Sequence, residues 1–262
     1  MISIIKEMTS GFRTLFPAGR FRFVLVVLAI LGAVISVSEL LVMKFFMNIV
    51  TQEGEIEQNR FILFGVGILV FFLLTRVAQY YQRTYRVTAF GRAFKGLKKV
   101  RRKGAGNPEW SMAFELSGVL THATQLAAIL IFFLILEPFF ALLNLLVLLL
   151  VITFIGRLFA RQIKIQEEML VEREGRRARP QRRFGQRIKA AETGALISGA
   201  GMIILLAALL FLSYTGEISL TNTLIFFLGS RLQNGALTNT SRGLMRYAKA
   251  KAGVSARANE DE

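Results

Sequence analysis

A few polar side chains interrupt the long apolar runs of this sequence, and they are the first candidates for chemistry. The 262 residues are 53% hydrophobic, with 23 phenylalanines. A charged or amide side chain inside such a run is costly in lipid, so it usually faces a protein interior or a water-filled path. The residues that fit this description predict a polar translocation cavity lined by Glu39, Arg76, His122, Gln125 and Asn144.

Glu39, Arg76 and His122 also have a purely structural interpretation. Glu39 can pair with Lys44 on the same helix, and Arg76 can extend its charge to the membrane surface while its stem stays in lipid. A histidine such as His122 more often bonds a neighbouring helix than relays protons. Both interpretations stay open for Glu39, whereas the structural one is the commoner for Arg76 and His122.

Other kinds of reactive site are missing from the sequence. The chain has no cysteine, which excludes disulfides and thiolate metal sites, and it has a single histidine. It contains no Ser/His/Asp set at a recognisable spacing and no G-x-x-x-x-G-K-[ST] phosphate loop. We therefore expect no enzymatic activity, no metal and no cofactor bound by this chain itself.

Six apolar segments must position the polar residues. Each is about long enough to cross a hydrocarbon core of ~30 Å as a helix. They predict an all-α, polytopic membrane protein with six transmembrane helices, and a single transmembrane domain over residues 1–262. The expected spans are roughly Phe23–Met47, Phe61–Tyr81, Gly118–Leu136, Phe139–Leu158, Gly194–Tyr214 and Leu220–Leu237.

The charges alternate between the two sides of these spans. Residues 83–103 hold nine basic residues and no acidic one, and residues 157–189 hold eleven basic and four acidic residues. In contrast, the loop after the first span is acidic and the other two loops on that side are very short. Because basic loops stay on the cytoplasmic side, both termini are predicted to be cytoplasmic, in a bacterial inner membrane.

The two basic loops are expected to be helical hairpins. The apolar residues after Arg83 recur at helical spacing, so the second span should continue inward as one long helix. The fourth span should likewise continue past Arg157, and Pro180 suits the first position of the helix that returns to the membrane. The tips of these short hairpins would be Gly104–Trp110 and Gly175–Gln181.

This layout resembles the transmembrane domain of the type I ABC exporter family. The likeness extends to four sequence segments, which are Ser38–Val50, Arg76–Lys103, Glu137–Glu168 and Tyr214–Val254. In that family the hairpin tips contact the nucleotide-binding domain. The resemblance therefore implies partner contacts at the two tips, through Asn107, Trp110, Arg177, Arg179 and Arg182.

The resemblance also implies partners and a function. Since the chain has no phosphate loop, ATP would act only through a separate ATPase subunit, and the exporter would move a hydrophobic or amphipathic substrate outward as a homo- or heterodimer. A structural subunit of the same fold, packed in a larger membrane complex, is the alternative. The arginine cluster around Pro180, in a chain of net charge +16, suits an acidic protein or anionic lipid head groups. Nucleic acid is the least favoured partner.

Overall fold

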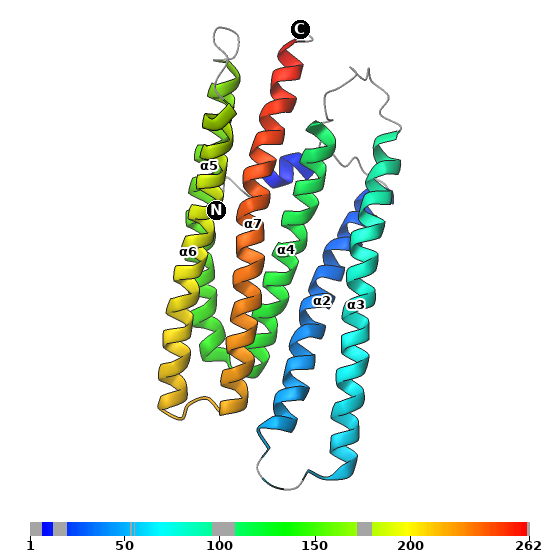
Figure 1. Ribbon diagram of the computed structural model, residues 1–262, viewed down its shortest axis with the longest axis vertical. Helices are drawn as coiled ribbons and strands as arrows, with labels where there is room; N and C mark the ends of the chain where they lie inside the picture. The colour runs from blue at the N-terminus through cyan, green and yellow to red at the C-terminus, as the bar shows by residue number, and fades with distance from the viewer. Residues whose placement is uncertain are drawn as a thin grey trace.

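The computed structural model describes residues 7–12, 20–52, 54, 56–95, 108–171 and 180–260. Throughout these residues the regular secondary structure is α-helical, and six long helices run roughly alongside one another (Figure 1). Residues 7–12 form a short helix ahead of them. The six helices are α2 (Arg20–Val50), α3 (Gln58–Lys95), α4 (Pro108–Leu136), α5 (Pro138–Val171), α6 (Pro180–Tyr214) and α7 (Leu220–Glu260).

Five of these helices, α2 to α6, are long and apolar enough to cross a membrane. Their most apolar stretches carry few charges and include many exposed Phe, Leu, Ile and Val side chains, which lipid tails can cover. The all-helical prediction is confirmed for the described residues, and the chain is an integral membrane protein. Each predicted span lies within one of the six helices.

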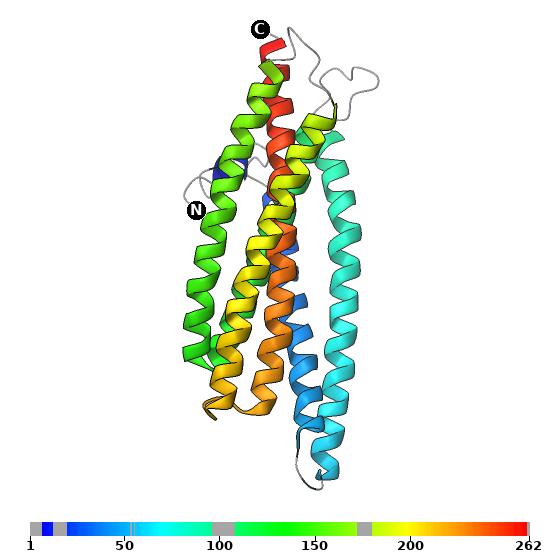
Figure 2. The same cartoon turned by 60° about the vertical axis from the view of Figure 1, so that its left-hand side comes forward.

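Helix α7 differs from the others because it lies at the centre of the bundle. It packs against α4, α5 and α6 and also touches α2. The other helices therefore cover one face of α7, and this buried face can carry polar residues such as Ser230, Gln233 and Ser241. Helix α3 is the opposite case, since it lies at the edge and packs almost wholly on α2 (Figures 1 and 2).

An aromatic cluster fixes the ends of α4, α5 and α7 that lie away from the carboxy terminus. Phe133, Phe140 and Phe226 are fully buried there, with ring centroids 4.6 to 5.7 Å apart. Gly229 makes this approach possible, because a Cβ at that position would lie 2.6 Å from the Phe133 ring. Such offset and edge-to-face aromatic contacts add to the stability that burial itself provides.

Helix α7 is longer than the hydrocarbon core of a membrane is thick. Helix α7 has 41 residues, which corresponds to ~60 Å at 1.5 Å per residue against a ~30 Å hydrocarbon core. The predicted continuations are confirmed as far as the structure describes them, because α3 runs to Lys95 and α5 runs to Val171. Helix α6 begins at Pro180, as predicted.

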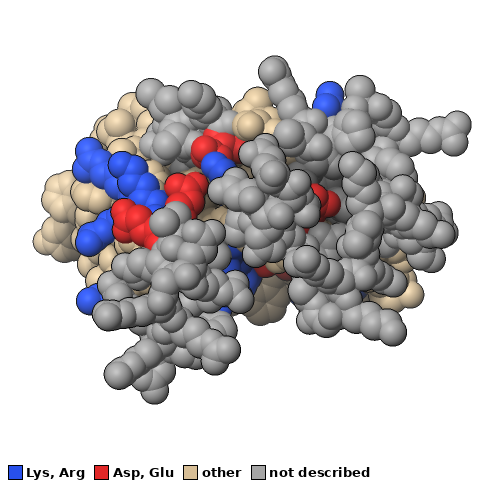
Figure 3. All heavy atoms as spheres, turned by 90° about the horizontal axis from the view of Figure 1, so that it is seen from above, with Lys and Arg blue, Asp and Glu red and all other residues tan. Residues whose placement is uncertain are grey.

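Ion pairs tie the helices together at the end that holds the carboxy terminus. They join Glu115 of α4 to Arg246 of α7 at 2.7 Å, Glu192 of α6 to Arg242 of α7 at 3.0 Å, and Glu7 of the short first helix to Lys251 at 2.6 Å. Basic and acidic side chains accordingly lie beside one another on this face (Figure 3). The pairs anchor the carboxy-terminal half of α7 to three other helices.

Candidate functional site

Three of the polar residues meet between α2 and α3. Gln79 Nε2 donates a hydrogen bond to Glu39 Oε1 across the two helices at 3.1 Å. Arg76 Nη1 approaches Gln79 Oε1 at 3.5 Å, the long limit of a hydrogen bond. Gln79 thus lies between an acid and a base, and we refer to Glu39, Gln79 and Arg76 as the α2–α3 polar cluster. Such a cluster can bind a polar group of either charge within the span.

The polar face of α3 continues beyond this cluster. Gln82 Nε2 donates to the Leu28 carbonyl of α2 at 3.0 Å, and Arg86 donates to the Phe114 carbonyl of α4. The Arg86 guanidinium also lies 3.6 Å from the centre of the Phe114 ring, which is a cation–π contact. Side chains of one polar face therefore hold α3 to its neighbours, while many apolar side chains on its other faces are exposed.

His122 and Gln125 form a separate pair on α4. His122 Nδ1 lies 2.8 Å from Gln125 Oε1, which requires Nδ1 to carry the proton. The pair is local to one helix turn. One residue earlier than Gln125, the Thr124 hydroxyl donates to the Ala29 carbonyl of α2 at 2.6 Å. The α2–α4 link in this region is thus made by Thr124 and not by the histidine.

Asn144 belongs to a third polar group, which joins α5 to α7. Its amide and that of Gln233 exchange two hydrogen bonds, from Asn144 Nδ2 to Gln233 Oε1 at 2.9 Å and from Gln233 Nε2 to Asn144 Oδ1 at 2.7 Å. Both side chains are buried, with 0% and 2% of their surface exposed. A neighbouring hydrogen bond joins α6 to α7, because the Ser198 hydroxyl of α6 donates to Asn234 Oδ1 of α7 at 2.5 Å.

The structure therefore distributes the five predicted cavity residues over three groups. It brings Glu39 and Arg76 together through Gln79, it pairs His122 with Gln125, and it pairs Asn144 with a residue of α7. Within one chain, the α2–α3 polar cluster is the group with a charged side chain exposed at the bundle surface. The role of these residues in translocation stays a prediction.

The predicted partner-contact tips fall mostly outside the described residues. Asn107, Arg177 and Arg179 lie in undescribed segments, and so does the side chain of Arg182. Trp110 is described, and it stacks on Phe114 with 5.3 Å between ring centroids, close to the core of the α4 and α7 helices. It therefore supports the base of the first hairpin.

Small residues of α6 have the packing role that their size suggests. A Cβ at Gly201 would lie 2.8 Å from a Val151 methyl group of α5, and one at Gly194 would collide with the Ser241 side chain of α7. Gly199, in contrast, faces open space. Close helix approach thus depends on Gly194 and Gly201.

Sequence reasoning missed several residues of these groups. Gln82 and Arg86 follow Gln79 at helical spacing, so the polar face of α3 was visible as a pattern. Gln233 was hidden because nothing in a sequence shows which helix will face Asn144. In the part of the chain that the structure describes, no three His, Cys, Asp or Glu residues gather as metal ligands would.

Neither a scan against protein-family models nor a search of curated proteins finds a match.

Proposed function

We propose that this chain is the membrane-spanning subunit of an ABC-type exporter that moves a hydrophobic or amphipathic substrate outward. In this proposal α7 is the sixth span, both termini are in the cytoplasm of a bacterial cell, and a separate ATPase subunit binds the end that carries the carboxy terminus. A second membrane subunit, either another copy or a related chain, faces α3. The main support is the position and surroundings of Arg76.

Arg76 lies inside the predicted span of α3, directly after its uninterrupted apolar run. The predicted span runs from Phe61 to Tyr81, so Arg76 lies about five residues, or ~7.5 Å, from the end of that span nearer the carboxy terminus. Its side chain is exposed at the surface of the single chain. An arginine at this depth is expected to face protein or water.

The conformation of the Arg76 side chain also argues that its guanidinium does not extend toward the membrane surface at the carboxy-terminal end of α3. Its guanidinium lies 5.0 Å from the centre of the Phe72 ring, one turn toward the amino-terminal end of α3. Side chains on a helix lean this way, and for Arg76 that direction leads further into the span. The charge is therefore held at depth, where a second subunit or a polar substrate path would cover it.

The length of the helices supports the same function. Helices α3, α5, α6 and α7 all extend past the membrane at one end, and the two hairpin tips join helices at that end. A separate ATPase could move these extensions together or apart, and the spans would follow as rigid rods. Substrate would then meet the α2–α3 polar cluster from alternating sides.

The first test concerns subunit association. We expect the native chain to be a dimer, or to carry a second membrane subunit, by native mass spectrometry in a mild detergent. Arg76→Met should weaken that association, whereas Arg83→Met, an exposed arginine two turns further along α3, should leave it intact. A native chain that is monomeric with no protein partner would contradict the proposal.

The second test separates export from the structural alternative. The tagged chain is purified from its own membranes, and the co-purifying proteins are identified by mass spectrometry. An ATPase subunit at a fixed stoichiometry supports the exporter, and replacing Arg176, Arg177, Arg179, Arg182 and Arg183 with Gln should release it in a salt-dependent way. A larger membrane complex without an ATPase supports the structural subunit.

A further inference from the structure

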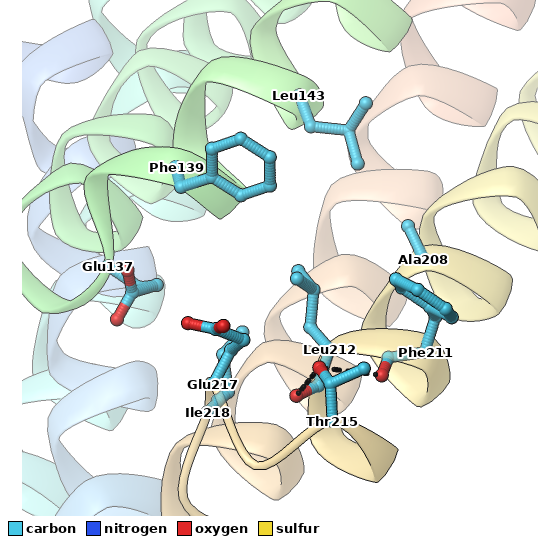
Figure 4. Close-up of a pocket in the computed structure, with 9 residues that line it drawn as sticks. All are labelled: Glu137, Phe139, Leu143, Ala208, Phe211, Leu212, Thr215, Glu217 and Ile218. Atoms are coloured by element: carbon cyan, nitrogen blue, oxygen red, sulfur yellow. Dashed lines mark hydrogen bonds between the residues drawn. The ribbon is translucent and has the colours of Figure 1, made fainter.

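A cavity of about 500 Å³ opens between α5 and α6 at the end of the bundle opposite the carboxy terminus. Its size is in the range of small-molecule sites. Its walls are mainly apolar, with Phe139 and Leu143 from α5 and Ala208, Phe211 and Leu212 from α6 (Figure 4). The remaining lining residues are Glu137, Thr215, Glu217 and Ile218.

Two carboxylates line this cavity, and Figure 4 shows them at the same margin, with the Glu217 carboxylate pointing toward Glu137. Glu137 comes from the junction of α4 and α5, and Glu217 comes from the turn between α6 and α7. Neither forms an ion pair with any residue that the structure describes, and the cavity lining includes no lysine or arginine. The cavity lining therefore includes two acidic side chains and no basic side chain.

The backbone holds both carboxylates in place. Glu137 is the single residue between two helices, and its amide donates to the Phe133 carbonyl while its own carbonyl accepts from Ala141. Gly216 ends α6 with a φ of 77°, a value that favours glycine. The amides of Glu217 and Ile218 then both donate to the Leu212 carbonyl. These bonds turn Glu217 back toward the cavity.

The apolar walls and the two carboxylates without a basic partner indicate which kind of ligand the cavity can bind. The apolar body must fill the space between Phe139 and Phe211, and the head group must carry net positive charge. A phospholipid does not fit this description, because its phosphate would meet two carboxylates and no basic side chain. We propose that this cavity binds a lipophilic cation, with its charge between Glu137 and Glu217.

A pair of ions with the same shape and opposite charge tests this proposal. Tetraphenylphosphonium and tetraphenylborate each place four phenyl rings around one charged atom. Their binding to the purified chain is measured by equilibrium dialysis, with protein-free micelles of the same detergent as the blank. Because binding is measured without nucleotide or transport, the result is independent of the proposed export function.

We expect saturable binding of the phosphonium and none of the borate. Glu137→Gln and Glu217→Gln should each weaken phosphonium binding by about 2- to 5-fold, as for partly solvated charge pairs, and the double variant by about tenfold. Phe211→Ala should also weaken it. The control is Glu57→Gln, which removes an exposed carboxylate from the same end of the chain but away from the cavity.

Three results would overturn the proposal. Equal binding of the phosphonium and the borate would show that the carboxylates give no charge selectivity. Equal losses in Glu57→Gln and Glu137→Gln would show that general surface charge attracts the cation. Phosphonium retention no greater than in protein-free micelles would show that the cavity binds no such ion. Circular dichroism of each variant confirms that the helices are intact.

Discussion

The paired amides of Asn144 and Gln233 should act as one unit in stabilising the bundle. Replacing Asn144 with Leu keeps a similar volume but leaves both polar atoms of the Gln233 amide buried without a partner. Interhelical hydrogen bonds in membranes contribute ~0.6 kcal/mol on average and up to ~1.7 kcal/mol each. Two lost bonds and one stranded amide therefore predict a loss of ~2–4 kcal/mol for Asn144→Leu.

A double-mutant cycle isolates this coupling. Gln233→Met should cost about as much as Asn144→Leu, because it strands the Asn144 amide instead. The double variant replaces both amides with apolar side chains of similar size, so we expect it to recover to within ~1 kcal/mol of the native chain. The coupling free energy between the two positions should then be at least ~3 kcal/mol.

Reversible unfolding in mixed micelles of mild detergent and dodecyl sulfate measures these free energies, with far-UV circular dichroism as the signal. Asn239→Leu is the matched control, since Asn239 is an exposed amide of the same helix. It should change stability by no more than ~0.5 kcal/mol. Additive losses in the double variant would refute the reasoning, because they would show that the two amides do not depend on each other.

Three further predictions concern packing, protonation and topology. Gly229→Ala should lower the free energy of unfolding by ~1–3 kcal/mol, because its Cβ would lie 2.6 Å from Phe133; the same unfolding assay should show no loss for Gly199→Ala, which faces open space. Burial, with the nearby Glu7 carboxylate adding, raises the pKa of Tyr247 to about 12. The folded chain thus holds this proton more tightly than the unfolded one, so its stability should be full below about pH 10 and fall toward pH 12. Tyr247→Phe should remove that alkaline loss, and an unchanged pH profile would exclude this residue as its cause. Finally, a cysteine at Gln52 should react with an impermeant reagent added outside the cell and one at Gln181 should not, and the reverse pattern would overturn the predicted orientation.

The helices could be predicted from the sequence because lipid imposes a strong rule. An apolar run of about 20 residues has few alternatives to a helix when no water is present to satisfy its backbone. The start of α6 was also predictable, since Pro180 lacks the N–H that a first helical residue does not use. These features depend on neighbours in sequence, or on the solvent alone.

The grouping of the polar residues could not be predicted in the same way. Asn144 and Gln233 lie 89 positions apart, and their pairing depends on how α5 and α7 are rotated about their axes. The same holds for Glu39 and Gln79, which meet because α3 packs on α2. A sequence shows which residues need partners, whereas the packing of helices decides which partners they find.

The position of α7 at the centre of the bundle constrains how the protein is made. The ribosome synthesises α7 after α2 to α6, and the polar side chains of α7 are costly to expose to lipid. The earlier helices must therefore already stand together in the membrane and offer the Asn144 amide and the Ser198 hydroxyl, to which Gln233 and Asn234 then bond. A chain whose synthesis stops before Leu220 would leave the Asn144 amide and the Ser198 hydroxyl without their α7 partners. We expect membrane quality-control proteases to degrade such a chain. The helical bundle is thus complete only when α7, its most polar helix, has packed at the centre.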